Sequence, residues 1–276
     1  IGSVPSAAGT SLAVRNNVKF HIDCDNTVTC VAPNVAPTAV TDESITLEWA
    51  PGYMENSWDL EYRADNGTWV SEGTVTTSPY TLTNLLPGTQ YGVRMRSDCG
   101  GTYSEWAGFN VTTECSSVTI PFSENFNNAP GSGAGNMIPC WTRNTNSTTA
   151  YPYTSSSYNH GGGNGYSVYF YGTASYYSYL ASPRFDDQVQ MNNLQIKFWA
   201  YKTSASYQIE VGIMSDPDNF STFESLGQFS PTNTSQWQKF EVNTNLYTGT
   251  GRYVAFRMPT NMTSYMYLDD IGWSTW

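Results

Sequence analysis

The sequence predicts an all-β chain made of two sandwich domains, with almost no helix. Short runs of alternating apolar and polar residues recur about every 8 to 12 residues, with turn residues between them. Only 13% of the residues are charged and 15% are aromatic, and the abundant Tyr, Thr, Val and Trp favour strands. A length of 276 residues suits two domains, each large enough for its own core.

Charge and hydropathy exclude several classes of partner. The formal net charge of -11 argues against nucleic acid and against electrostatic adhesion to anionic membranes. No apolar run reaches the roughly 18 residues of a membrane helix, so we expect no membrane span. The chain starts at Ile1 and Gly2 rather than Met, as expected of a mature or trimmed fragment. We expect a monomer.

The chain divides into three segments. Residues 1–30 are predicted to be an N-terminal linker or partial domain with one strand, Val18–Ile22. Residues 31–114 are predicted to form one sandwich and residues 115–276 a second one. In the first sandwich we expect strands at 45–50, 58–64, 68–72, 79–83, 90–97 and 106–112, and the turn Asp65-Asn66-Gly67 suits a hairpin.

One stretch of the first sandwich resembles a known family. Leu85-Leu86-Pro87-Gly88-Thr89-Gln90-Tyr91 leads into a strand, and Ile45–Trp49 and Trp58–Arg63 alternate upstream of it. Together these segments resemble a fibronectin type III domain over residues 33–114. The resemblance implies that Tyr91 buries its ring and turns its hydroxyl back to the backbone at the sandwich corner. It also implies a spacer or a binding platform.

The second sandwich has too many strands for another domain of that kind. We expect strands at 167–171, 177–182, 194–201, 206–214, 236–242, 252–258 and 265–273, and Gly/Asn/Ser/Tyr-rich loops at 127–140 and 144–165. Eight or nine strands in this segment predict a jelly roll. The predicted fold class is therefore all-β, a fibronectin type III sandwich followed by a jelly-roll β-sandwich.

Several motifs of the second sandwich also match a family. In order, they are Ile120–Phe126, Ile138–Trp141, Gly163–Phe170, Tyr179–Pro183, Val211–Pro217 and Tyr267–Ile271. In that order they resemble the cleaved-adhesin or MAM-like jelly rolls of Bacteroidetes surface proteins. The resemblance covers nearly all of residues 116–276 and implies an adhesin-like, calcium-stabilised jelly roll on the cell surface.

The same resemblance suggests calcium ligands. Related jelly rolls hold a structural Ca²⁺ with acidic residues in the first and last strands, which points to Glu124, Asp269 and Asp270. The alternative is that Asp269 and Asp270 end a strand and face water. In residues 144–165, Thr, Tyr and Ser replace the acidic calcium loop of some relatives, which argues against a second ion. Asp216-Pro217-Asp218-Asn219 is better explained as a plain turn.

The five cysteines match no zinc motif and suggest an oxidising compartment. In a fibronectin-type sandwich, strand A starts at the pole where strand F ends, so Cys30–Cys99 is one expected pair. Cys115 and Cys140 would then join at the start of the second domain, and Cys24 would be left over. The rival pairing is Cys24–Cys30 across a short hairpin. The sequence does not decide between the two.

Tyrosines are concentrated between residues 151 and 179, at positions 151, 153, 158, 166, 169, 171, 176, 177 and 179. Exposed aromatic rings stack on sugar faces, and tyrosine hydroxyls can hydrogen-bond to glycan oxygens. In a strand only every second residue shares a face, so at most half of the set can form one platform. Alternate tyrosines of 166–179 could instead fill the core. We expect the loop residues Tyr151, Tyr153 and Tyr158 to be the binding candidates.

Catalytic motifs are missing from the sequence. It contains neither a Gly-x-Ser-x-Gly elbow nor a His-Glu-x-x-His motif, and His21 and His160 are isolated. Glu210 and Glu241 could pair for glycoside hydrolysis only if the fold brought them together.

We therefore expect a non-enzymatic surface adhesion protein that binds a glycan or an extracellular host protein. The alternatives are a carbohydrate-binding or accessory module of a larger secreted hydrolase, and a structural stalk. The expected location is extracellular or on the cell surface, with an outer-membrane lipoprotein as one form of anchoring.

Overall fold

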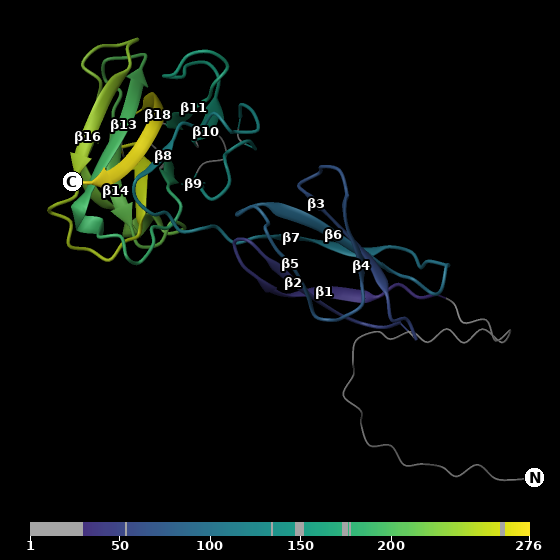
Figure 1. Cartoon of the computed structure of the whole chain (residues 1–276). Helices are drawn as coiled ribbons and strands as arrows, with labels where there is room; N and C mark the ends of the chain where they lie inside the picture. Colours follow the sequence, from purple (N-terminus) through teal and green to yellow (C-terminus); the bar gives the residue numbers. More distant parts are fainter. Residues whose placement is uncertain are drawn as a thin grey trace, which may run out of the picture.

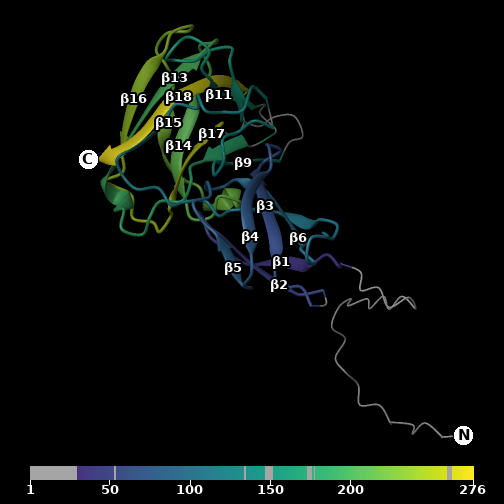
Figure 2. The ribbon, with the colours of Figure 1, turned by 45° about the vertical axis from the view of Figure 1, so that its right-hand side comes forward.

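The computed structural model describes residues 30–52, 54–133, 135–146, 152–172, 176, 178–259 and 263–276. Figures 1 and 2 show two separate β-sandwiches, one built from β1–β7 and the other from β8–β18. Helical structure in these ranges is limited to two short 3-10 turns, η1 (Met191–Asn193) and η2 (Phe220–Thr222). No helical segment in the described residues has the length and apolar character needed to cross a membrane. The predicted strand Val18–Ile22 and Cys24 lie outside the described residues.

The first sandwich packs a three-stranded sheet on a four-stranded sheet. The order β1-β2-β5 joins β1 (Asn34–Val40), β2 (Ile45–Ala50) and β5 (Tyr80–Leu82). The order β4-β3-β6-β7 joins β4 (Val70–Val75), β3 (Trp58–Ala64), β6 (Gln90–Ser97) and β7 (Ala107–Thr112). The inward residues of both sheets form one core, which includes Leu47, Trp49, Trp58, Leu60, Val93 and Met95.

The predicted corner of this sandwich is present. The Tyr91 ring is buried, and its hydroxyl accepts a hydrogen bond from the Leu86 backbone N–H at 2.8 Å. Two residues on, Gly88 has a φ of +58°, which glycine adopts without steric cost. The Pro87-Gly88 turn thus leads the chain into β6 as the sequence predicts.

The second sandwich has the two-sheet arrangement predicted for a jelly roll. One sheet has the order β10-β11-β18-β13-β16, and β8 pairs with β18 beside it. Its strands are β8 (Phe122–Glu124), β10 (Tyr153–Ser155), β11 (Ser167–Gly172), β13 (Leu194–Lys202), β16 (Gln238–Asn243) and β18 (Ser264–Thr275). The other sheet has the order β15-β14-β17-β12-β9. Its strands are β9 (Thr142–Thr145), β12 (Ser178–Ala181), β14 (Ile209–Met214), β15 (Glu224–Phe229) and β17 (Tyr253–Arg257).

Between these sheets lies the main core, which includes Phe170, Leu180, Phe198, Val211, Phe256 and Leu268. The outer face of the β15-β14-β17-β12-β9 sheet is covered as well. There Phe220 and Phe223 pack on a second small cluster that contains Tyr179 and Met214. Tyr179 donates its hydroxyl to the Pro217 carbonyl at 2.8 Å, which ties the covering loop to the sheet.

In the jelly roll, four strands were not predicted from the sequence: β8, β9, β10 and β15. Three of them have only three or four residues, too few to show a clear period. The fourth, β15, is a mostly exposed edge strand with a register shift against β14. The predicted loop 144–165 is interrupted by the end of β9 and by β10.

Two disulfides tie the fold together. Cys30 joins Cys99, and Cys115 joins Cys140. This is the first of the two pairings that the sequence left open. The second disulfide lies against the corner of the first sandwich, because a Cβ added to Gly88 would collide with Cys140 Sγ. The disulfide therefore fixes the start of the jelly roll beside the Pro87-Gly88 turn.

Candidate binding site

A row of aromatic side chains crosses the outer face of the β10-β11-β18-β13-β16 sheet. Strand register places Tyr153 beside Tyr169, Tyr169 beside Tyr267, and Tyr267 beside Tyr201. Trp237, just before β16, extends the row with its ring 5.4 Å from that of Tyr201. The other ring centroids are 5.1, 4.6 and 6.0 Å apart along the row. Cross-strand neighbours share a face, so these five residues, here called the aromatic row, form one surface.

Three more tyrosines widen the aromatic row at one side. Tyr171 lies opposite Tyr265 in register, with ring centroids 5.0 Å apart. Tyr265 contacts Tyr207 at 5.1 Å, edge to face. All three side chains are partly exposed. Tyr171 and Tyr265 lie outside the core because they alternate with the inward-facing Phe170 and Met266, whereas Tyr207, which precedes β14, also packs against the edge of the core.

The loop between β10 and β11 folds back over the aromatic row. Tyr158 of this loop stacks on Tyr201 at 4.5 Å and meets Tyr267 edge to face at 4.9 Å. Tyr158 itself is 40% exposed, whereas Tyr201 and Tyr267 are only 7% and 8% exposed. Tyr158 is thus the most accessible ring at the centre of the surface.

His160 fastens this loop to the sheet. Its ring stacks on Trp199 at 3.8 Å, and its Nδ1 lies 2.6 Å from Asp270 Oδ2. The His160 backbone N–H donates to Asp269 Oδ2 at 2.7 Å. Although His160 is isolated in the sequence, in the structure it lies at the edge of the candidate surface.

Burial perturbs the ionisable groups below the loop. It raises the pKa of Tyr267 to about 12 and that of Tyr169 further, so both hydroxyls stay protonated and can donate hydrogen bonds. Burial also raises the pKa of Asp269 to about 6, against the opposing effect of two backbone N–H donors. The surface therefore presents neutral hydroxyls and ring faces, with the His160–Asp270 pair at its edge and the Lys239–Glu241 pair beside Trp199.

Of the three predicted binding tyrosines, two belong to this surface. Tyr153 is a member of the aromatic row, although it lies in β10 rather than in a loop, and Tyr158 lies above the row. Tyr151 lies outside the described residues. Sequence reasoning missed Tyr201, Tyr267 and Trp237, whose outward positions could have been found from the alternation of their strands.

The predicted calcium ligands do not converge. Strand β8 pairs with β18, as expected, but Glu124 lies opposite the core residue Ile271 and Asp269 lies opposite Trp199 on the outer face. Glu124 Oε1 accepts the Phe126 N–H at 2.7 Å, and burial raises the pKa of Glu124. Asp269 accepts two backbone N–H groups. Ca²⁺ needs about six to eight oxygens.

Across the described part of the chain, no three His, Cys, Asp or Glu side chains are grouped to hold a metal. Glu124, Asp269 and Asp270 therefore form no ready-made carboxylate cluster. The calcium site stays a prediction from the sequence.

The two carboxylates considered for glycoside hydrolysis are separated. Glu210 lies in β14 and Glu241 in β16, which belong to different sheets. Glu210 is paired with Arg257 at 2.7 Å and Glu241 with Lys239 at 2.8 Å. The Asp216–Asn219 segment is a turn, in which Asp216 Oδ1 accepts the Asp218 N–H.

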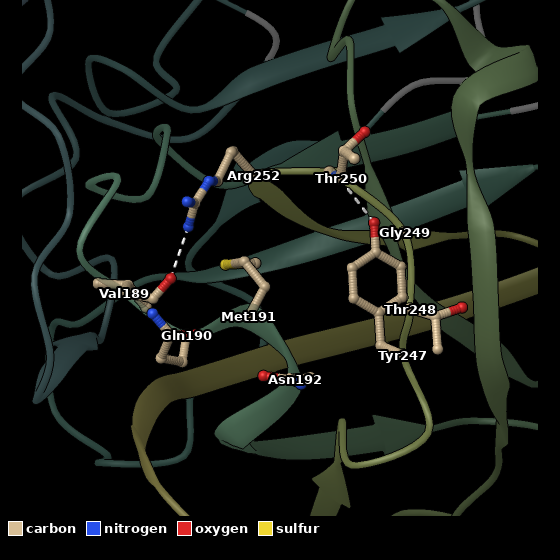
Figure 3. A pocket seen from close by; sticks show the side chains of 10 residues that line it. Val189, Gln190, Met191, Asn192, Tyr247, Thr248, Gly249, Thr250 and Arg252 are labelled. Atoms are coloured by element: carbon tan, nitrogen blue, oxygen red, sulfur yellow. Dashed lines mark hydrogen bonds between the residues drawn. The ribbon is translucent and has the colours of Figure 1, made fainter.

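Figure 3 shows a pocket of about 350 Å³ between the segments Val189–Asn192 and Tyr247–Arg252. Arg252 is the one charged residue in its lining. Its guanidinium donates to the carbonyls of Val189, Asp186 and Asp187. Tyr247 Oη accepts the Gly251 N–H. Arg252 and Tyr247 are therefore engaged within the protein, and the other polar side chains of the lining, Gln190, Asn192, Thr248 and Thr250, are uncharged. The aromatic surface, which groups many rings on one face, is the stronger candidate.

Comparison with known proteins confirms the family predicted for the first sandwich. Residues 31–110 match the family model of the fibronectin type III domain. Residues 31–110 form a fibronectin type III domain. A solved fibronectin type III domain of human collagen XX is 26% identical, with a TM-score of 0.29, over 31% of this chain and 92% of that one.

The jelly roll resembles solved adhesin domains. The K1 cleaved adhesin domain of Lys-gingipain from Porphyromonas gingivalis W83 is 20% identical, with a TM-score of 0.41, over 57% of this chain and 99% of that one. The K2 cleaved adhesin domain of Lys-gingipain is 19% identical, with a TM-score of 0.44, over 56% of this chain and 100% of that one. No curated protein matches the chain.

Proposed function

We propose that this chain is an extracellular adhesion module whose jelly roll binds a glycan on the aromatic face described above. The observation that supports this most is the aromatic row, five rings placed side by side by strand register, with Tyr158 exposed above them. Ring faces suit the apolar C–H faces of sugars, and the protonated hydroxyls suit sugar oxygens. The two disulfides are consistent with an oxidising, extracytoplasmic location.

The shape of the surface favours a glycan over a folded protein partner. It is a patch of tyrosines on one face of a sheet, and Tyr201 and Tyr267 are nearly covered. Protein interfaces of standard size bury about 800 Å² on each partner, whereas a few exposed rings suffice for one or two sugar units. The fibronectin type III domain would then act as the spacer.

A glycan array tests this proposal directly, run with calcium and again with chelator. Tyr158→Ala should weaken binding of any hit by about two- to tenfold, since an aromatic contact contributes about 0.5 to 1.5 kcal/mol. Trp276→Ala is the matched control, because Trp276 is 65% exposed but lies just beyond the opposite end of β18. Equal losses in the two variants would contradict the placement of the site. Binding that chelator abolishes would support the calcium prediction.

An array without hits in either condition would argue against a glycan. An array of extracellular-matrix proteins would then test the host-protein alternative with the same two variants. A protein hit that survives Tyr158→Ala would place the adhesive surface elsewhere.

A further inference from the structure

A ladder of alternating guanidinium and aromatic groups covers the outer face of the β4-β3-β6-β7 sheet. Its members, in spatial order, are Arg63, Trp69, Arg94, Trp106, Arg96 and Tyr103. Each guanidinium carbon lies between 3.9 and 4.7 Å from the centre of the neighbouring ring. Such contacts are cation–π interactions, each of which contributes about 0.5 to 1 kcal/mol at an exposed site. The ladder lies on the first sandwich and is therefore separate from the aromatic surface of the jelly roll.

Two arginines of the ladder have a carboxylate partner directly across the strand pair. Arg94 lies opposite Glu61 in register, and its Nε donates to Glu61 Oε2 at 2.8 Å. Arg96 lies opposite Asp59, and its Nη2 donates to Asp59 Oδ2 at 2.9 Å. Both positive charges are thus neutralised within the sheet.

The third arginine lacks such a partner. Arg63 lies opposite Gly92, so the position that holds a carboxylate in the other two pairs has no side chain. The Arg63 Nε is buried and has no hydrogen-bond partner. No carboxylate in the described part of the chain forms an ion pair with it. A buried donor left unpaired is costly, so an incoming anion would gain by pairing with it.

A pocket opens beside this arginine. It has a volume of about 300 Å³, and its lining includes Arg63, Trp69, Arg94, Trp106 and Asn110. The volume lies at the low end of small-molecule sites, which suits a compact ring-shaped ligand. Asn110 is exposed and offers an amide to ligand hydroxyls.

Charge limits the kind of anion. Residues 31–114 contain eleven Asp or Glu residues and no basic residue other than the three ladder arginines, so their formal charge is -8. A polyanion would be repelled by this field, whereas a single carboxylate at short range would not. An extended acidic peptide would pair with a sheet edge rather than with a pocket on the face between two indoles.

We propose that this pocket binds a sugar residue that carries a single carboxylate, with Arg63 as its ion-pair partner. The C–H groups of the sugar would contact the indoles of Trp69 and Trp106, and Asn110 would hydrogen-bond to a hydroxyl. The site is independent of the glycan surface on the jelly roll, so either can fail without the other.

The test is a titration of the full chain with glucuronate, followed through the arginine Nε–H signals in a nitrogen-15 NMR spectrum. Glucuronate should shift the Arg63 signal, and glucose at equal concentration should not. Arg63→Gln should weaken the response of the neighbouring Arg94 signal about tenfold, since it removes a charged hydrogen-bond partner. Arg184→Gln, on an exposed arginine of the jelly roll, should leave it unchanged.

A second variant supplies the missing carboxylate internally. Gly92→Asp would place a Cβ 3.2 Å from Arg63 Nε and from Asn110 Oδ1, both atoms of flexible side chains. It should abolish the response to glucuronate, while unchanged Arg96 signals would show that the sheet is intact. The proposal is overturned if Gly92→Asp or Arg63→Gln binds like the wild type. It is also overturned if acetate or an acidic peptide binds as tightly as glucuronate.

Discussion

Replacing His160 with Ala should loosen the loop that carries Tyr158 without unfolding the jelly roll. The substitution removes two close contacts, the stack on Trp199 at 3.8 Å and the Nδ1 pair with Asp270 at 2.6 Å, and a longer edge-on contact with Trp237 at 5.7 Å. The ring stack contributes about 0.5 to 1.5 kcal/mol. The ion pair is partly exposed, with 26% and 39% of the two side chains accessible, so solvent screening limits it to about 0.5 kcal/mol.

Together, the ring stack and the pair with Asp270 contribute about 1 to 2 kcal/mol, which sets the expected change in the hydrogen-exchange rate of the loop. If the loop opens before its amides exchange, hydrogen exchange of residues 156–166 should become about 5 to 30 times faster. The effect should stay local, because the His160 N–H still donates to Asp269 and no core residue changes. Mass spectrometry of the exchanged peptides measures it, and Asn164→Ala is the control, since Asn164 is an exposed residue of the same loop.

Unchanged exchange in His160→Ala would refute this reasoning, since the loop would then be held by something other than its histidine. Faster exchange throughout the jelly roll would refute it differently, by showing that the histidine supports the whole domain. Local loosening would have a functional consequence. Tyr201 and Tyr267 would become more accessible, and binding to the aromatic face should change with them.

Three further predictions concern stability. Tyr91→Phe leaves the Leu86 N–H unpaired and should destabilise the first sandwich by about 1 to 3 kcal/mol, measured by urea unfolding of the full chain. Glu210→Ala leaves the nearly buried Arg257 without its partner and should cost about 3 kcal/mol, seen in the jelly-roll transition. Burial holds the pKa of Asp269 near 6, above its ordinary 3.8. Between pH 3.8 and pH 6, Asp269 therefore keeps a proton in the folded chain that it loses in the unfolded chain. Stability should therefore rise as the pH falls from 7 to 5, and Asp269→Asn should remove that part of the pH dependence.

The strands with strong alternation could be predicted from the sequence, and their partners could not. The predicted strand at 206–214 contains β14, and the predicted strand at 194–201 matches β13 closely. The aromatic row depends on register between strands far apart in the chain, such as Tyr153 and Tyr267. Alternation says which face a residue occupies but not which strand lies beside it.

The predicted calcium ligands show in a similar way what alternation in the sequence does not reveal, here the position of a single bulge. Pairing of the first and last strands was expected, and β8 does pair with β18. However, a bulge in β18 shifts the alternation, since the core residues are Met266 and Leu268 before it and Ile271 and Trp273 after it. Asp270 has a φ of +45° at this point. The bulge separates Asp269 from the face that Glu124 shares, and no sequence pattern marks it.

The two outer faces of the jelly roll differ in how they are covered, and this difference indicates which one can bind. The β15-β14-β17-β12-β9 face is closed by aromatic packing of Phe220 and Phe223 and by the Glu210–Arg257 pair, which has little contact with solvent. Opening it would expose apolar surface and a charged pair. The loop over the aromatic row is instead held through His160 by ring contacts with Trp199 and Trp237 and by two polar contacts, and Tyr158 above it is 40% exposed. A ligand that stacks on Tyr158 would leave the core and the Glu210–Arg257 pair undisturbed, so the aromatic face is the one on which we place the proposed glycan site.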